Sequence, residues 1–151
     1  MLLVVGFSTA TIPDTLVKVI DKYLAPLEIA CAWEDKLYIE YQAPIATLAE
    51  VKELSHIFSR EEAVAVISGV LQGWLTLCSS GLPLPPILDA NIYLNAGGDV
   101  KLGNWVPTDE SGDNFEAWLS KFLTWAVSES ERDLLQPIIL QPHMDIIKVC
   151  D

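Results

Sequence analysis

Apolar residues recur every three or four positions in the middle and last third of the chain, which is the spacing of a helix with one buried face. Three such stretches begin with a short polar residue followed, three positions later, by a Glu. This pair of side chains satisfies the free amides of a helix N-terminus. We therefore predict three capped helices, of which the second is the longest and ends at Gly81. The capping pairs are Thr47 with Glu50, Ser59 with Glu62, and Asp113 with Glu116.

Strand patterns dominate the first third of the chain and recur once later. A helix is predicted between the first two strands, from Pro13 to Leu24, because its apolar residues have helical spacing and Pro26 follows. The order of strand, helix, two strands, then mainly helices with one hairpin predicts a single α+β domain over residues 1–151. The strands are expected at Leu2–Phe7, Glu28–Trp33, Lys36–Gln42, Ile92–Leu94 and Val100–Leu102.

The charge of the chain excludes two classes of partner. The formal net charge is −12, and the nine Lys and Arg residues are scattered singly. Phosphate backbones and anionic membranes both require basic patches, so we expect neither nucleic acid nor a membrane as a partner. A basic partner protein is compatible with this charge, although a high net charge also serves solubility alone.

Cysteine usage and targeting signals favour the cytoplasm. Cys31, Cys78 and Cys150 lie far apart and make no metal-binding spacing with the two His residues. We expect three reduced thiols. The apolar start Met1–Phe7 is too short for a signal peptide, and no run approaches the roughly 18 apolar residues of a membrane span.

The stretch Asn91–Val106 reads N-I-Y-L-N-A-G-G-D-V-K-L-G-N-W-V. It resembles the catalytic core of a protein kinase, in which a loop H-R-D-x-x-x-x-N leads into a strand, a glycine turn, a second strand and D-F-G. The order of elements is also similar to a kinase from its third strand onward. Trp33–Tyr41 is similar to the strand that leads into the kinase hinge, and Ser59–Leu82 is similar to kinase helix E.

The resemblance covers about residues 1–105 and implies a partial kinase-like fold. Residues 1–43 would be the remnant of the N-lobe, with a small antiparallel sheet and a helix similar to helix C. Residues 44–151 would be a mainly helical remnant of the C-lobe. Only Pro107–Gly112 separates the D-F-G position from the next predicted helix, so the activation segment of a kinase is expected to be absent.

The catalytic positions of the motif are replaced. A Pro neither accepts a proton nor orients a hydroxyl, and a neutral amide is a weak ligand for a hard cation that prefers carboxylate. Leu2–Phe7 contains no Lys at the third-strand position, and the chain begins after the strands that would carry the glycine-rich loop. By the resemblance, the His, Arg and catalytic Asp of the kinase loop are replaced by Leu84, Pro85 and Pro86. The D-F-G motif is replaced by Asn104, Trp105 and Val106. The second metal-binding Asn is matched by Asn91.

Positioning and electrostatic stabilisation supply almost all of the catalysis of phosphoryl transfer. The resemblance therefore implies a pseudokinase with no catalytic residue, metal or cofactor, in which Asn91 and Asn104 are vestigial. Leu84 and Trp105 would still pack into the core. Such a protein would act through protein–protein interaction, as a scaffold, regulator or decoy of a kinase pathway. Its partner would be an active kinase, that kinase's substrate or a second copy of the chain.

Two other functions remain open on the sequence. One is a small acidic adaptor or effector, unrelated to kinases, that binds a basic partner protein. The other is a hydrolase that uses a pair of Asp or Glu side chains, although nothing in the sequence brings two of them together.

Overall fold

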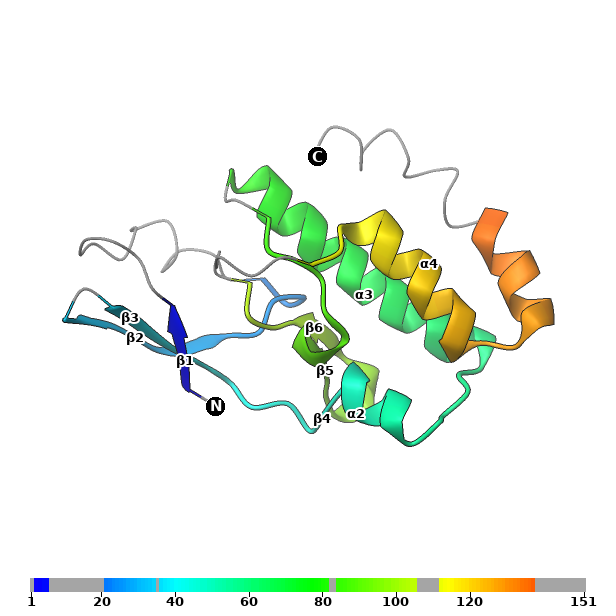
Figure 1. Ribbon diagram of the computed structural model, residues 1–151, viewed down its shortest axis with the longest axis horizontal. Helices are drawn as coiled ribbons and strands as arrows, with labels where there is room; N and C mark the ends of the chain where they lie inside the picture. The colour runs from blue at the N-terminus through cyan, green and yellow to red at the C-terminus, as the bar shows by residue number, and fades with distance from the viewer. Residues whose placement is uncertain (1, 6–20, 35, 82–83, 106–111, 138–151) are drawn as a thin grey trace.

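The structure is a computed structural model that describes residues 2–5, 21–34, 36–81, 84–105 and 112–137. It is a mixed α+β arrangement, in which a first sheet lies at one end, the helices lie at the other, and a second small sheet lies between them (Figure 1). Both sheets are antiparallel and three-stranded, with orders β1-β3-β2 and β4-β5-β6. The strands are β1 (Leu2–Val5), β2 (Leu27–Trp33), β3 (Lys36–Tyr41), β4 (Ala46–Thr47), β5 (Ile92–Leu94) and β6 (Val100–Leu102), and the helices are α2 (Leu48–Glu53), α3 (Arg60–Ser79), α4 (Phe115–Ala126) and a last one over residues 129–137.

Four of the predicted strands are confirmed, and their bounds differ from the predicted ones by no more than about one residue. They are β2, β3, β5 and β6. The first predicted strand is confirmed over Leu2–Val5, and its last two residues lie outside the described residues. The two-residue strand β4 was not predicted, because two residues carry no periodicity. Most of the helix expected from Pro13 to Leu24 also lies outside the described residues, and its described end, residues 21–24, is a turn followed by an isolated bridge from Leu24 to Leu102.

Two of the three predicted capping boxes are confirmed. The Thr47 hydroxyl accepts a hydrogen bond from the amide of Glu50, and the Glu50 carboxylate accepts one from the amide of Thr47 at 2.6 Å. Ser59 and Glu62 make the same pair at the start of α3. These bonds favour the ionised form, so they lower the pKa of both Glu side chains below the ordinary value of 4.5.

The third capping prediction is wrong by one residue. Asn114, not Asp113, caps α4, since its side-chain oxygen accepts a hydrogen bond from the amide of Ala117 at 2.9 Å. Asp113 instead forms an ion pair with Lys121, two turns along the same helix, at 2.7 Å. Asn and Asp are nearly equivalent as caps, so the sequence alone does not decide between two such neighbours.

Helix α3 packs on strand β6 through two glycines that leave room for the strand. A Cβ atom at Gly69 would lie 2.6 Å from the Cβ of Val100, and one at Gly73 would lie 2.9 Å from the carbonyl oxygen of Tyr23. Both glycines are buried. Because they lie one turn apart on the helix, a single face of α3 contacts both the hairpin and the segment around Tyr23.

By length and composition, α3 is apolar enough to cross a membrane, and half of its most apolar window is buried inside the structure. The capping box at Ser59 and the close packing against β6 identify α3 as the core helix of this domain.

The expectation of three reduced cysteines is also wrong in part. Cys31 is a free, exposed thiol on β2, whereas Cys78 near the end of α3 is disulfide-bonded.

We expect Gly69→Ala and Gly73→Ala each to destabilise the fold. Alanine favours a helix by about 1 kcal/mol over glycine, but a new Cβ forced into a filled core costs about 1–3 kcal/mol, and at Gly73 the obstacle is backbone. Urea unfolding measures the change, with Gln72→Ala on the exposed face of the same helix as the control. If the glycine variants were more stable than the wild type, the close packing would be refuted.

The capping boxes predict a dependence of stability on pH. A carboxylate whose pKa is lowered by folding stabilises the native state above its unfolded pKa, and this contribution is lost as the pH falls through the folded pKa. We therefore expect a Glu50→Gln/Glu62→Gln variant to melt below the wild type at neutral pH, and the gap to close as the pH falls below 4.5. Thermal unfolding across pH tests this, with Glu53→Gln as the control, and a gap that does not change with pH would contradict it.

Candidate functional site

The hairpin β5–β6 brings together Asn91 and Asn104, the two positions that the kinase resemblance singles out. Asn91 ends a short 3-10 helix (Asp89–Asn91) just before β5, and Asn104 follows β6. Because Ile92 pairs with Leu102 in the antiparallel ladder, the residues just outside that pair meet at the open end of the hairpin. Both asparagines are buried, with 7% and 9% of their surface exposed.

The two side-chain amides bond directly to each other. The Nδ2 of Asn104 donates to the Oδ1 of Asn91 at 2.8 Å. The backbone closes the same turn, since the amide of Gly103 donates to the carbonyl of Asn91 at 2.7 Å. The ring of Tyr93 covers Gly103 so closely that a Cβ there would overlap it, and burial raises the pKa of the Tyr93 phenol. We call Asn91 and Asn104 the asparagine pair, which Tyr93 and Gly103 cover.

Trp105 ties this centre to the N-terminal part of the chain. Its indole Nε1 donates to the carbonyl of Ala25 at 2.9 Å, and its ring meets Tyr41 edge-on at 6.1 Å between centroids. The amide of Ala25 in turn donates to the carbonyl of Leu102 at 2.8 Å. Trp105 is 1% exposed, so its expected place in the core is confirmed. Leu84 is partly buried and packs against the hydrophobic core, as expected.

The position expected for a catalytic base holds a proline ring. Pro86 is half-buried, and a Cβ at Gly112 would overlap it. Pro85 is buried, and the next residue, Ile87, donates its amide to the carbonyl of Asp113 at 2.8 Å. Val106 lies outside the described residues. In this segment Leu84, Pro85 and Pro86 carry apolar side chains, and the backbone amide of Ile87 is used within the fold.

Two carboxylates near this loop make structural contacts. Asp89 accepts a hydrogen bond from the indole Nε1 of Trp118 at 3.0 Å and pairs with Lys52 at 3.2 Å. Asp113 is paired with Lys121. In the part of the chain that the structure describes, no three His, Cys, Asp or Glu side chains gather as metal ligands. The sequence did not reveal the role of Asp89, because its partners lie on two other helices.

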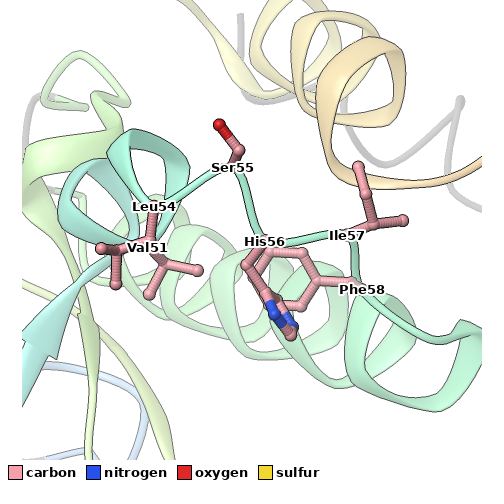
Figure 2. Close-up of a pocket in the computed structure, with 6 residues that line it drawn as sticks. All are labelled: Val51, Leu54, Ser55, His56, Ile57 and Phe58. Atoms are coloured by element: carbon pink, nitrogen blue, oxygen red, sulfur yellow. The ribbon is translucent and has the colours of Figure 1, made fainter.

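A second feature lies on the surface between α2 and α3. Six consecutive or nearly consecutive residues line an open hollow with a volume of about 590 Å³ (Figure 2). Figure 2 shows the side chains of Val51 and Leu54 together on one side, and the rings of His56 and Phe58 together on the other. We call this hollow the α2–α3 groove, and its lining residues are Val51, Leu54, Ser55, His56, Ile57 and Phe58.

The groove corrects one sequence prediction. The helical spacing of Val51, Leu54 and Ile57 after the Thr47 cap predicts one helix that carries all three residues. Helix α2 instead ends at Glu53. Leu54 is 81% exposed and Ile57 is 57% exposed. The positive φ of Ser55, +55°, turns the chain after the helix. An exposed Leu and Ile on a loop look the same in sequence as a helical core face.

The floor of the groove is fixed to α4. The amide of Phe58 donates to the carbonyl of Ala126 at 2.7 Å. The Phe58 ring packs against Phe122 and Trp125, with centroids 5.8 and 6.1 Å away, and Lys52 lies 5.1 Å from the Trp125 ring centroid. These contacts hold Phe58, one of the residues that line the groove, against α4.

Protein-family models give no match to this chain, and a search of curated proteins finds no similar sequence.

The asparagine pair predicts a coupling energy. Removing one amide leaves the other buried and unpaired, which costs about 1–3 kcal/mol, whereas removing both costs less than the sum. We expect Asn91→Ala and Asn104→Ala each to destabilise the fold, and the double variant to show a coupling of about 1 kcal/mol. Urea unfolding of the four proteins measures it. Strictly additive losses would show that the two side chains do not interact in solution.

Proposed function

We propose that this protein is a catalytically inactive, kinase-like domain that works by binding another protein. The observation that carries this proposal is the direct hydrogen bond between Asn91 and Asn104. By the resemblance, these two positions would hold metal ions in an active kinase. Here they are neutral amides bonded to each other, so their polar groups are used within the fold.

The arrangement of the elements supports the kinase-like part of the proposal. The hairpin β5–β6 packs beside the long helix α3, as the resemblance requires for the hairpin after helix E. The Trp105 indole fills the core at the position of the family's Phe. An acidic adaptor unrelated to kinases has no need of this hairpin beside α3.

The chemistry at the other family positions supports the absence of catalysis. Phosphoryl transfer needs a base or water-positioning group and cations on the phosphates. A proline ring stands at the base position, and the asparagine pair offers no carboxylate. The nearby Asp89 and Asp113 are each held by a lysine, which also leaves little support for the hydrolase alternative.

The surface supports the binding part of the proposal. The α2–α3 groove exposes apolar side chains next to the Phe58 ring, which packs on α4, and exposed apolar surfaces are common at protein interfaces. An active kinase, its substrate or a second copy of the chain are the partners that the resemblance implies, and the groove gives this class of function a physical place on the molecule.

We expect the purified protein to transfer no phosphate from ATP with Mg²⁺, either to itself or to a generic protein substrate. An active protein kinase is the positive control. Thermal unfolding in the same solutions, with EDTA as the comparison, should show no shift that depends on Mg²⁺. A ligand at 100 times its Kd stabilises a protein by about 2.7 kcal/mol, so binding at millimolar ATP would be seen. Phosphate transfer that is abolished by Asn91→Ala would refute the proposal.

A further inference from the structure

We propose that the α2–α3 groove is the docking site for an amphipathic partner helix whose apolar face is flanked by Lys and Arg. This inference rests on the proposed function, because it assigns a surface and a partner chemistry to the protein–protein interaction. It is carried by two independent properties of the groove, which are its exposed apolar lining and the unbalanced acidic charge around it.

The apolar lining has the shape of an anchor site. Leu54 is 81% exposed at one lip of the groove, beside the half-buried Val51. Across the groove from Leu54 lies His56, which packs edge-to-face on the buried Phe58 ring at 4.8 Å between centroids. Interfaces gain most of their affinity from a few apolar or aromatic side chains in a supported pocket, and a helix in a groove supplies such side chains every three or four residues.

The charge around the groove is acidic, and its cations are already paired. Lys52 binds Asp89, and Arg60 makes two hydrogen bonds to Glu131, at 2.7 and 3.0 Å. Lys52 and Arg60 therefore neutralise carboxylates that lie outside residues 50–62. The other exposed acidic residues of 50–62 are four glutamates, Glu50, Glu53, Glu61 and Glu62. Of these, Glu62 lies 3.6 Å from the Nε2 of His56, which adds a positive charge only when protonated.

Hydrogen bonds from the caps hold the pKa of Glu50 and Glu62 low. In the described part of the chain, Glu53 and Glu61 form no ion pair within 4 Å. A rim of this sign attracts a basic segment and repels nucleic acid, anionic membranes and acidic proteins. A second copy would bring the same acidic rim to the contact, which disfavours groove-to-groove dimers.

A synthetic amphipathic helix with Leu on one face and Lys on the other is the probe, and its counterpart with Glu in place of Lys is the negative probe. Fluorescence anisotropy of the labelled peptides measures binding to the full chain. We expect the Lys peptide to bind, its affinity to fall as salt rises because the exposed charges are screened, and the Glu peptide to bind at least about tenfold more weakly.

Leu54→Ser removes the apolar anchor without changing the net charge, and we expect it to weaken binding of the Lys peptide about tenfold. Trp33→Ser is the matched control. It removes an apolar side chain that is 67% exposed, on β2 at the opposite end of the molecule (Figure 1), and should leave binding unchanged. Leu54 is too exposed for this substitution to unfold the domain, and circular dichroism checks this.

A charge variant tests the rim independently. Glu53→Lys/Glu61→Lys should weaken binding of the Lys peptide and flatten its salt dependence. Glu28→Lys/Glu34→Lys is the matched control, because it makes the same change in net charge at exposed residues in β2 and in the turn after it. It separates a local effect from the attraction of an acidic protein for any basic peptide.

The proposal is overturned if the Lys peptide does not bind, or if it binds the Leu54→Ser and Glu53→Lys/Glu61→Lys variants as tightly as it binds their controls. In that case the groove is not the site, and protein binding through another surface would be unaffected. Phosphate transfer in the kinase assay would instead refute the proposed function while leaving the peptide result intact, so the two failures are distinguishable.

Discussion

The close contact between α3 and the hairpin β5–β6 is the constraint on which the rest of the structure depends. Gly69 and Gly73 let the strand approach the helix without a side chain between them. That approach places Leu102 where it accepts the amide of Ala25 and donates its own amide to the carbonyl of Tyr23, both at 2.8 Å. The contact therefore joins the helical part of the chain to the segment that leads into the first sheet.

The asparagine pair follows from this arrangement. Once β6 is fixed on α3, the residues after it are fixed too, and Asn104 takes a φ of +47° opposite Asn91. Buried polar groups need partners, and an unpaired amide here would cost about 1–3 kcal/mol. Each asparagine supplies the other's partner, so the centre is stable as a neutral pair. In the proposed function this pair serves the fold, and the binding surface is expected on the outside of the molecule.

The sequence predicted the elements whose signals are local. The capping boxes at Thr47 and Ser59, the two long hairpin-forming strands and the hairpin around Gly97 and Gly98 all rest on neighbouring residues, and the structure contains them. The burial of Leu84 and Trp105 was predicted from the resemblance and is found.

What the sequence missed depends on contacts between distant residues or on where a helix stops. Asp89 binds Lys52 and Trp118, which are 37 and 29 residues away. The groove exists because α2 ends at Glu53. The helical spacing of apolar residues continues past Glu53, so the sequence predicts a longer helix. Chain reversals after short helices and long-range polar contacts leave no periodic pattern, so the asparagine pair was visible only as two vestigial positions and the groove was not visible at all.

The most direct test of a closed, non-catalytic centre is an NMR titration of the side-chain amides of Asn91 and Asn104 with Mg²⁺ and ATP, assigned by comparison with Asn104→Ala. We expect the Asn104 amide to exchange slowly with solvent, as a buried hydrogen-bonded donor does, and its resonance to stay in place when both are added. A saturable shift of both amides that requires Mg²⁺ and ATP together would show that the pair opens to hold a metal–nucleotide complex, and would contradict the inactive, binding role proposed for this protein.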